Sequence, residues 1–116
     1  MSTRSITHIH ESHTGNENIV CSFYRHCDGY PDGHGKDLKE WLNDKKLVNG
    51  ISVGFVPGRD FNRAGTMAVP LMKYIQDISG CEVIPTGQTG YGEEYIYDIY
   101  FREDAFVVEV TNCYGN

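Results

Sequence analysis

The sequence has no excess of basic residues and no long apolar run. Ten lysine and arginine residues stand against sixteen acidic ones, which gives a formal net charge of −6. Proteins that bind long nucleic acids present a basic stripe to the phosphates, so this balance argues against such a partner. No apolar run approaches the roughly 18 residues of a spanning helix, and the N-terminal segment lacks the apolar core of a signal peptide. We therefore expect a cytoplasmic protein without membrane attachment.

Closely spaced cysteine pairs are also missing. The four cysteines stand at positions 21, 27, 81 and 113, and none forms a C-x-x-C pair. Structural zinc sites usually combine cysteine and histidine ligands at shorter spacings than that of Cys21 and Cys27. His8 and His10 are two residues apart, so we expect them on one strand face, at the surface. We expect free thiols, no metal and no cofactor.

What the chain does have is enough apolar sequence for one core. Its 116 residues are 40% hydrophobic and 12% aromatic, and they include eight tyrosines against one tryptophan. This length corresponds to one domain over residues 1–116. Tyrosine combines a flat apolar ring with a polar tip, which suits half-buried strands and ligand stacking.

The hydrophobic pattern predicts strands at both ends of the chain. Alternating β-branched and aromatic residues predict strands at residues 2–10, 19–26, 81–85, 94–101 and 105–111. The turn 14–18 and the turn 102–104 are short, so each is expected to join antiparallel neighbours. Ile51, Val53 and Phe55 alternate as in a further short strand, which glycine and proline interrupt.

Two helices are predicted in the middle of the chain. Asp37 and Glu40 have the spacing of a capping box, so the first helix is expected to start there and to stop at Asn49 and Gly50. The second covers about 65–79, and Pro70 suggests that it begins only near residue 69. Gly80 is a suitable residue to end it. The predicted fold class is α+β, with a ββααβββ order and two helices on one face of an antiparallel sheet of about five strands.

The segment 24–38, YRHCDGYPDGHGKDL, is the first candidate site. It combines a strand end, a glycine-rich turn and a helix start, where backbone N–H groups attract anions. Glycine would let a ligand approach the backbone. The alternative is a stiff turn with a surface histidine. The candidate ligand-binding residues here are Tyr24, Arg25, Asp28, Tyr30 and His34.

The segment 58–65, GRDFNRAG, is the second candidate site. Arginine can bind a phosphate, phenylalanine can stack on a base and asparagine can read a base edge. The alternative is an ordinary loop with solvated arginines and a core phenylalanine. The candidate residues here are Phe61, Asn62 and Arg63. Arg4 is added as the cation of the first strand, although a pair with Glu93 or Glu94 is the favoured alternative.

Motifs of known enzyme classes are missing. The chain contains no G-x-S-x-G, no H-E-x-x-H, no P-loop and no Rossmann fingerprint. Cys27 with a histidine lacks an orienting third group. An acid–base role of His34 and Asp28 stays open as an alternative. Whether the protein is an enzyme is therefore left open, with a binding protein favoured.

Five stretches resemble a widespread family of small phage and prophage proteins, most of which have no assigned activity. The stretches are T-R-S, Y-R-H-x-D-G-Y-P-x-G-H-G-K-D-L, V-N-G, F-N-x-A-G and G-E-E-Y-I-Y-x-I, here at residues 3–5, 24–38, 48–50, 61–65 and 92–99. The resemblance spans nearly the whole chain. Position 27, cysteine here, differs in the family, which argues against Cys27 as a nucleophile. Pro70 also departs from the alanine-rich helix of the family.

The resemblance implies a role against the bacterial host. Some small phage proteins act as oligomeric "sponges" that sequester the cyclic nucleotide signals of bacterial immunity. We therefore expect a homodimer or homotetramer that binds a small anionic nucleotide, cyclic or linear, and so serves anti-defence. The alternatives are a phosphodiesterase-like enzyme that degrades such a nucleotide and a protein that binds and inhibits a host protein. The role of the loop 86–92 is open.

Overall fold

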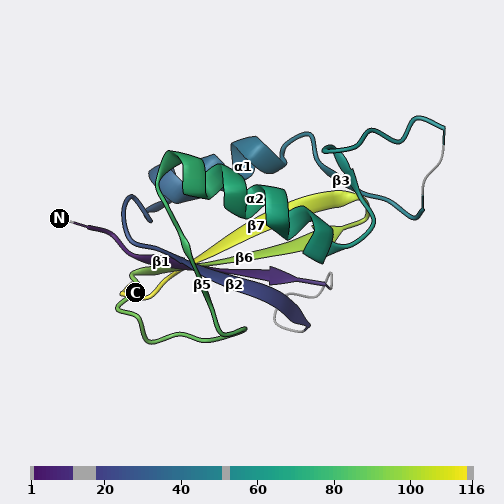
Figure 1. The fold of residues 1–116 in the computed structure, drawn as a ribbon. Helices are drawn as coiled ribbons and strands as arrows, with labels where there is room; N and C mark the ends of the chain where they lie inside the picture. The colour runs from purple at the N-terminus through teal and green to yellow at the C-terminus, as the bar shows by residue number, and fades with distance from the viewer. Residues whose placement is uncertain (1, 12–17, 51–52, 115–116) are drawn as a thin grey trace.

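Seven strands form one mixed sheet in a computed structural model of the chain, which describes residues 2–11, 18–50 and 53–114 (Figure 1). The strand order across the sheet is β4-β3-β7-β6-β1-β2-β5. The strands are β1 (Ser5–His10), β2 (Ile19–Arg25), β3 (Lys46–Leu47), β4 (Asp60–Phe61), β5 (Glu82–Ile84), β6 (Tyr95–Arg102) and β7 (Ala105–Asn112).

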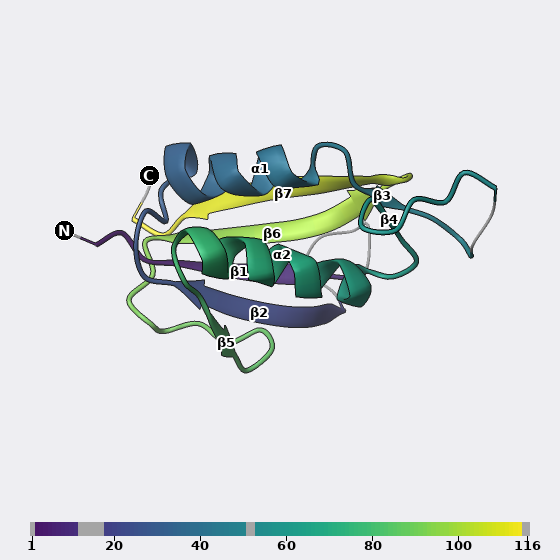
Figure 2. The same cartoon turned by 45° about the horizontal axis from the view of Figure 1, so that its top comes forward.

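The helices lie on one face of this sheet, as the sequence predicts. They are a π-helical turn η1 (Pro31–Gly35), the helix α1 (Lys36–Leu42) that continues it, and α2 (Ala64–Ile78). Figure 2 shows α1 lying along β7 and α2 lying over β1 and β2. The α+β class with two helices on one sheet is therefore confirmed.

The sheet itself differs from the prediction. It has seven strands rather than about five, and it is not purely antiparallel. The strands β1 and β2 are antiparallel, as are β6 and β7. The strands β1 and β6, however, pair in parallel, from Ser5 opposite Tyr95 to Ile9 opposite Ile99. Short turns specify local antiparallel pairs, whereas a pairing between distant strands has no local signal in the sequence.

The core lies between the helices and the sheet. Residues 5, 7 and 9 of β1 face the helices, and their neighbours face the other side. The residues of this core that are less than 9% exposed are Ile9, Phe23, Leu38, Leu42, Phe61, Ala64, Met67, Ala68, Leu71, Ile75, Tyr97 and Ile99.

The first helix starts earlier than the capping-box pattern predicts. Pro31 stands at the first position of η1, where its fixed φ and missing N–H are tolerated. The N–H of Lys36 bonds back to the carbonyls of Gly33 and Pro31, so the chain is already helical there. Asp37 therefore caps nothing; its carboxylate pairs with Arg25 instead. The helix also ends at Leu42, before the predicted stop at Asn49.

The second helix contains the proline that the sequence places at its start. The helix α2 begins at Ala64, and Pro70 lies inside it. Proline removes the bond to the carbonyl four residues earlier, on Thr66. Thr66 is exposed, so water can satisfy that carbonyl. Gly80 ends the helix as predicted, with a φ of 93° and its N–H bonded to the Ile75 carbonyl.

The weakly patterned segments carry little regular structure. Of the possible strand at residues 51–55, positions 51 and 52 lie outside the described residues and positions 53–55 are not in a strand. The predicted turn at 14–18 lies outside the described residues except for Asn18. In their place, β3 and β4 contribute two residues each, too few for a periodic signal.

Candidate functional site

Arg25, a predicted ligand-binding residue, lies in the interior. Its exposed fraction is 4%. Its Nη1 group donates to the Asp37 carboxylate at 2.8 Å, and its Nε group donates to the Cys27 carbonyl at 2.7 Å. The guanidinium is thus held by partners from the same glycine-rich segment. It fixes the turn between β2 and α1 rather than facing solvent.

His34 has no exposed surface. Its Nε2 atom lies 2.7 Å from Thr7 Oγ1, and its Nδ1 atom lies 3.1 Å from Arg25 Nη1. Its ring also contacts Phe23 and Tyr97 edge-on. Burial lowers the pKa of His34 to about 3, and the charge of Arg25 acts in the same direction. A neutral imidazole without access to solvent gives no support to an acid–base role.

The glycines of this segment allow the chain to pack against itself. A Cβ on Gly33 would lie 2.4 Å from the Asp28 carbonyl, and one on Gly29 would lie 2.7 Å from the Thr3 carbonyl. A Cβ on Gly35 would lie 3.1 Å from the ring of Tyr97. The glycines do allow other groups to approach the backbone closely, as the sequence indicates. These groups, however, belong to the protein itself and not to a ligand.

Two predicted residues of the same turn remain at the surface. Asp28 has a φ of 60° and is exposed. Tyr30 is 40% exposed, and its hydroxyl lies 3.4 Å from Asp28 Oδ1. Both residues therefore lie at the surface, near the C-terminal end of β2. Neither of them contacts the buried guanidinium of Arg25.

The second predicted segment makes structural contacts of its own. Arg63 Nε donates to Glu11 Oε1 at 3.1 Å, and the N–H of Ala64 donates to Glu11 Oε2 at 2.9 Å. Glu11 thus occupies the start of α2. Phe61 is 8% exposed and stacks on Trp41. The side-chain oxygen of Asn62 accepts a bond from the Gly50 N–H.

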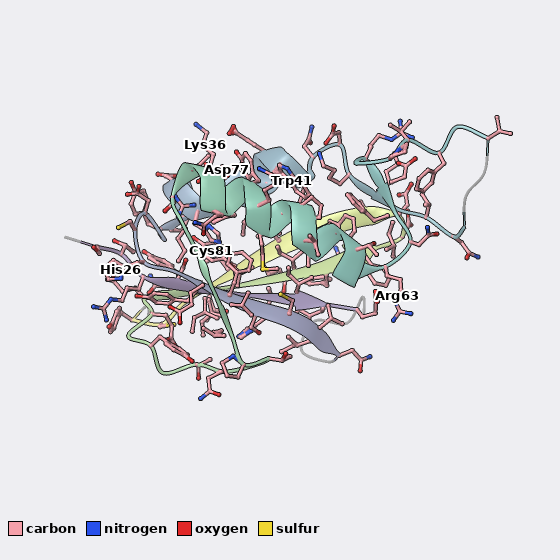
Figure 3. The ribbon with its side chains drawn as sticks, in the orientation of Figure 1. His26, Lys36, Trp41, Arg63, Asp77 and Cys81 are labelled. Carbon is pink, nitrogen blue, oxygen red and sulfur yellow. The ribbon has the colours of Figure 1, made fainter. Side chains whose placement is uncertain are left out.

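The two predicted segments lie at opposite ends of the sheet. Arg25 pairs with Ser5 at the first residue of β1, whereas Arg63 contacts Glu11, just beyond its last residue. At about 3.3 Å per residue, the length of β1 separates them by about 17 Å. Figure 3 shows His26, next to Arg25 in the chain, and Arg63 toward opposite ends of the molecule. One protomer therefore does not bring the two segments into a common site.

Two other predicted residues, Arg4 and Tyr24, do come together. They are joined by Tyr91, from the loop whose role the sequence leaves open. The rings of Tyr24 and Tyr91 lie 5.8 Å apart, and Arg4 Nη1 lies 3.4 Å from the Tyr91 carbonyl. Burial raises the pKa of Tyr24, and the charge of Arg4 acts against that shift. With His26, whose Nδ1 atom lies 2.8 Å from the Tyr24 hydroxyl, they form what we term the Arg–Tyr surface.

Arg4 is exposed and forms no ion pair with any residue that the structure describes. Arg25, Arg59 and Arg63 each contact a carboxylate. Among the described residues no carboxylate lies within ion-pair distance of Arg4. The favoured pair with Glu93 or Glu94 is thus absent, because Glu93 accepts bonds from the N–H groups of Gly90 and Tyr91. Glu93 fixes the loop that carries Tyr91, and Arg4 donates to the Tyr91 carbonyl rather than to a carboxylate.

A hollow opens beside the Arg–Tyr surface. It has a volume of about 250 Å³ and lies between the end of β2 and the link from α2 to β5. Pockets for drug-sized ligands start at roughly 300 Å³, so this hollow suits a single ring system. Its lining residues are Tyr24, His26, Ser79, Gly80, Cys81 and Glu82.

The predicted pair of surface histidines lies in the interior. His8 and His10 do share one face of β1, but their exposed fractions are 5% and 1%. His8 Nδ1 lies 2.7 Å from Ser22 Oγ, and His10 Nε2 lies 2.7 Å from Asp98 Oδ1. Burial lowers the pKa of His8. Over residues 2–11, 18–50 and 53–114, no group of three or more His, Cys, Asp and Glu residues is placed to hold a metal ion.

The sequence gives only a weak signal for Tyr91 and His26. Tyr91 stands between two glycines, and an aromatic residue in such a loop is a candidate contact residue. His26 is the last residue of the predicted strand 19–26, and it follows the end of β2 at Arg25. Neither is near Arg4 in the chain, so only the fold joins them.

Comparison with protein-family models, with characterised proteins and with solved structures gives no match to this chain. In the part of the chain that the structure describes, no helix has the length and apolarity that crossing a membrane requires.

Proposed function

We propose that the protein binds a small nucleotide at the Arg–Tyr surface. The observation that supports this most directly is the exposed guanidinium of Arg4, which pairs with no carboxylate of the described residues and lies beside the paired rings of Tyr24 and Tyr91. Guanidinium groups bind phosphate through fixed N–H donors, and tyrosine rings stack on bases without strong sequence preference. A nucleotide carries both a phosphate and a base.

The charges around the surface define how the ligand would lie. Glu82 lines the hollow, and the C-terminal end of α2 carries a partial negative charge beside it. A phosphate there would be repelled, whereas a neutral base would be accepted. We therefore propose that the base enters the hollow beside Tyr24 and that the phosphate faces Arg4.

The size of the hollow sets the rest of the proposal. The hollow of about 250 Å³ suits one ring system, so a cyclic dinucleotide would extend beyond a single protomer. A homodimer or homotetramer would supply the second wall, since symmetric copies present the same surface twice. In the phage context that the sequence resembles, such binding would sequester an immune signal of the host.

A thermal-shift panel of linear and cyclic nucleotides tests the proposal. Ligand at roughly 100 times its Kd should stabilise the protein by about 2.7 kcal/mol. Arg4→Ala and Tyr91→Ala should each remove this shift while leaving the unliganded Tm near its original value, because Arg4 is exposed and Tyr91 is only partly buried. Arg102→Ala is the matched control, since Arg102 is exposed and also lacks a carboxylate partner among the described residues.

The ligand is then recovered from denatured protein. Recovery of intact nucleotide supports binding. Recovery of new products would instead show that the protein degrades the nucleotide. A full shift in both the Arg4 and Tyr91 variants would refute this site.

A further inference from the structure

The outer edge of β7 is almost unpaired. One side of β7 pairs with β6 along its whole length, from Ala105 opposite Arg102 to Asn112 opposite Tyr95. On the other side, β3 pairs only at Ala105. No other strand among the described residues lies beside positions 106–112. An open edge of this length is a template for a further strand.

The chemistry of this edge suits strand addition. The hairpin between β6 and β7 has two connecting residues, so the peptide groups of Ala105 and every second residue bond to β6. The groups of Val108 and Val110 consequently point away from the sheet, whereas Phe106 adjoins the single pairing with β3. Val110 is 43% exposed. The edge therefore combines free backbone donors and acceptors with apolar side chains.

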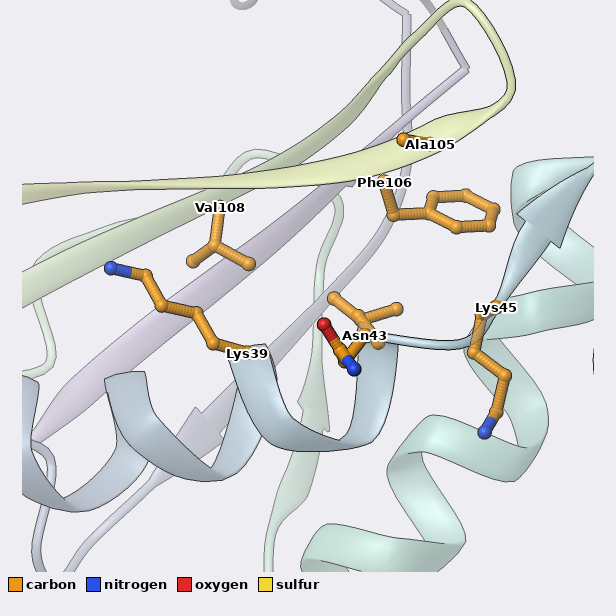
Figure 4. A pocket seen from close by; sticks show the side chains of 7 residues that line it. Lys39, Asn43, Lys45, Ala105, Phe106 and Val108 are labelled. Carbon is orange, nitrogen blue, oxygen red and sulfur yellow. The ribbon is translucent and has the colours of Figure 1, made fainter.

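A groove runs beside the edge, between β7 and α1 (Figure 4). Its volume is about 320 Å³. Phe106, Val108 and Leu42 supply apolar lining, and Lys39 extends along Val108. Lys45 is engaged, because its Nζ contacts Asp44 at 2.8 Å and lies over the Trp41 ring. Lys39 is exposed, and no carboxylate of the described residues lies within ion-pair distance of it.

We propose that this groove binds an extended acidic segment of another protein, which adds to β7 as a strand. Main-chain hydrogen bonds to the outward groups of β7 supply affinity, and alternate side chains enter the groove. The segment places apolar side chains against Phe106 and an acidic side chain against Lys39. On its other face it carries no acid opposite Glu109, because like charges across a strand pair are unfavourable.

A second copy of this chain fits the edge less well. If β7 strands from two copies pair in antiparallel fashion with Glu109 at the centre, the two Glu109 side chains lie directly opposite each other. Pairing them about Val108 brings Lys39 of one copy to Lys39 of the other, since Lys39 lies along Val108. The register about Glu109 gives the greatest overlap of residues 106–112, and both of these registers join like charges. The observations thus favour a different, acidic partner.

The test uses NMR titration of the full chain with the acidic peptide acetyl-TVTETVT-amide. Its alternate residues present valine and glutamate to the groove, and acetyl-TVTKTVT-amide is the charge-reversed control. We expect saturable shifts of the Val108 and Val110 amides, with a Kd below about 1 mM, and slower hydrogen exchange at both. Lys39→Glu should weaken binding about tenfold, whereas Lys73→Glu, the same charge change on α2, should not.

A backbone variant separates strand addition from simple charge attraction. Val110→Pro removes an outward N–H but no bond to β6, so the sheet should persist while the peptide no longer binds. Full binding by this variant, or no shifts at β7 with the glutamate peptide, would overturn the proposal. A dimer of the free protein that Val110→Pro dissociates would also overturn it in favour of a second copy. Nucleotide stabilisation is a separate readout and does not depend on this edge.

Discussion

Arg25 illustrates how a charged side chain can belong to the interior of a small protein. A buried charge is tolerated only when it is paired and its donors are satisfied. Here Asp37 supplies the charge, and the Cys27 carbonyl and His34 supply acceptors. The four groups come from one segment of the chain, so the network ties the end of β2 to α1.

Replacing Arg25 should therefore destabilise the fold. We expect Arg25→Ala to lower the free energy of unfolding by about 3 kcal/mol, because Asp37 and His34 lose their partner in a largely dry site. Urea denaturation followed by circular dichroism measures the change. Arg63→Ala is the matched control: its side chain is 72% exposed, so its pair with Glu11 should contribute less than about 1 kcal/mol. Equal losses in the two variants would contradict this assignment.

His34 predicts how stability responds to acid. Its pKa is near 6.5 in the unfolded chain and about 3 in the fold, so the unfolded chain binds more protons between these values. Stability is complete above the unfolded pKa and falls as the pH falls. The lowered pKa of His8 acts in the same direction. We expect urea denaturation to show a loss of about 2 kcal/mol between pH 6.5 and 4.5.

The variant His34→Gln is the control for this pH profile. Glutamine keeps a polar group for Thr7 but does not titrate. The free energy of unfolding of this variant should therefore vary much less over the same pH range. A wild-type profile that is flat down to about pH 4.5 would show that protonated His34 is accommodated.

At the scale of elements, the predictable features are the local ones. The helix α2 has a continuous apolar stripe, from Met67 to Ile75, and the hairpin β6–β7 has strong alternation around a short turn. Neither the parallel contact of β1 with β6 nor the two-residue strands β3 and β4 leave a local pattern. The same holds for the candidate site. Arg4 and Tyr24 could be selected by residue type, but Tyr91 joins them only through the register of the sheet.

The start of α2 depends on a residue far away in sequence. Arg63, at its N-cap position, has an extended backbone and makes no side-chain cap, and the first turn carries no acid. Glu11, directly after β1, accepts the N–H of Ala64 instead. This contact fastens the helix to the central strand and places a negative charge at the positive end of the helix dipole.

Glu11→Ala should consequently lower the free energy of unfolding by about 1 kcal/mol, the usual value of a helix cap. For a domain of this size the melting temperature should fall by about 4 °C. Glu11→Gln keeps an acceptor oxygen without the charge, so its loss should be smaller. An unchanged melting temperature in Glu11→Ala would mean that water replaces the carboxylate.

At the scale of the whole molecule, both helices and the sheet share one core. Trp41, the single tryptophan, stacks on Phe61 of β4 and on Tyr74 of α2. Its fluorescence therefore reports the contact of three elements that are distant in sequence. The radius of gyration of 13.8 Å is close to the roughly 13 Å expected of a compact domain of this length.

We expect unfolding to be a single cooperative transition. Trp41 fluorescence and far-ultraviolet circular dichroism should give the same urea midpoint, because no element has a core of its own. Two separated midpoints would indicate that the β3–β4 end unfolds independently of the rest. Tyr30→Ala, at the surface of the opposite end, is a control that should leave both midpoints unchanged.

The parallel pairing of β1 with β6 also affects how the protein is made. Tyr95 pairs with Ser5, so 90 residues separate two partners at the centre of the sheet. On the ribosome, β1 and β2 can form their hairpin early, but one edge of β1 stays open until β6 has been translated. Closing so long a loop slows folding, and an open edge in the nascent chain favours aggregation. Synthesis of this protein should therefore benefit from a chaperone that shields strand edges.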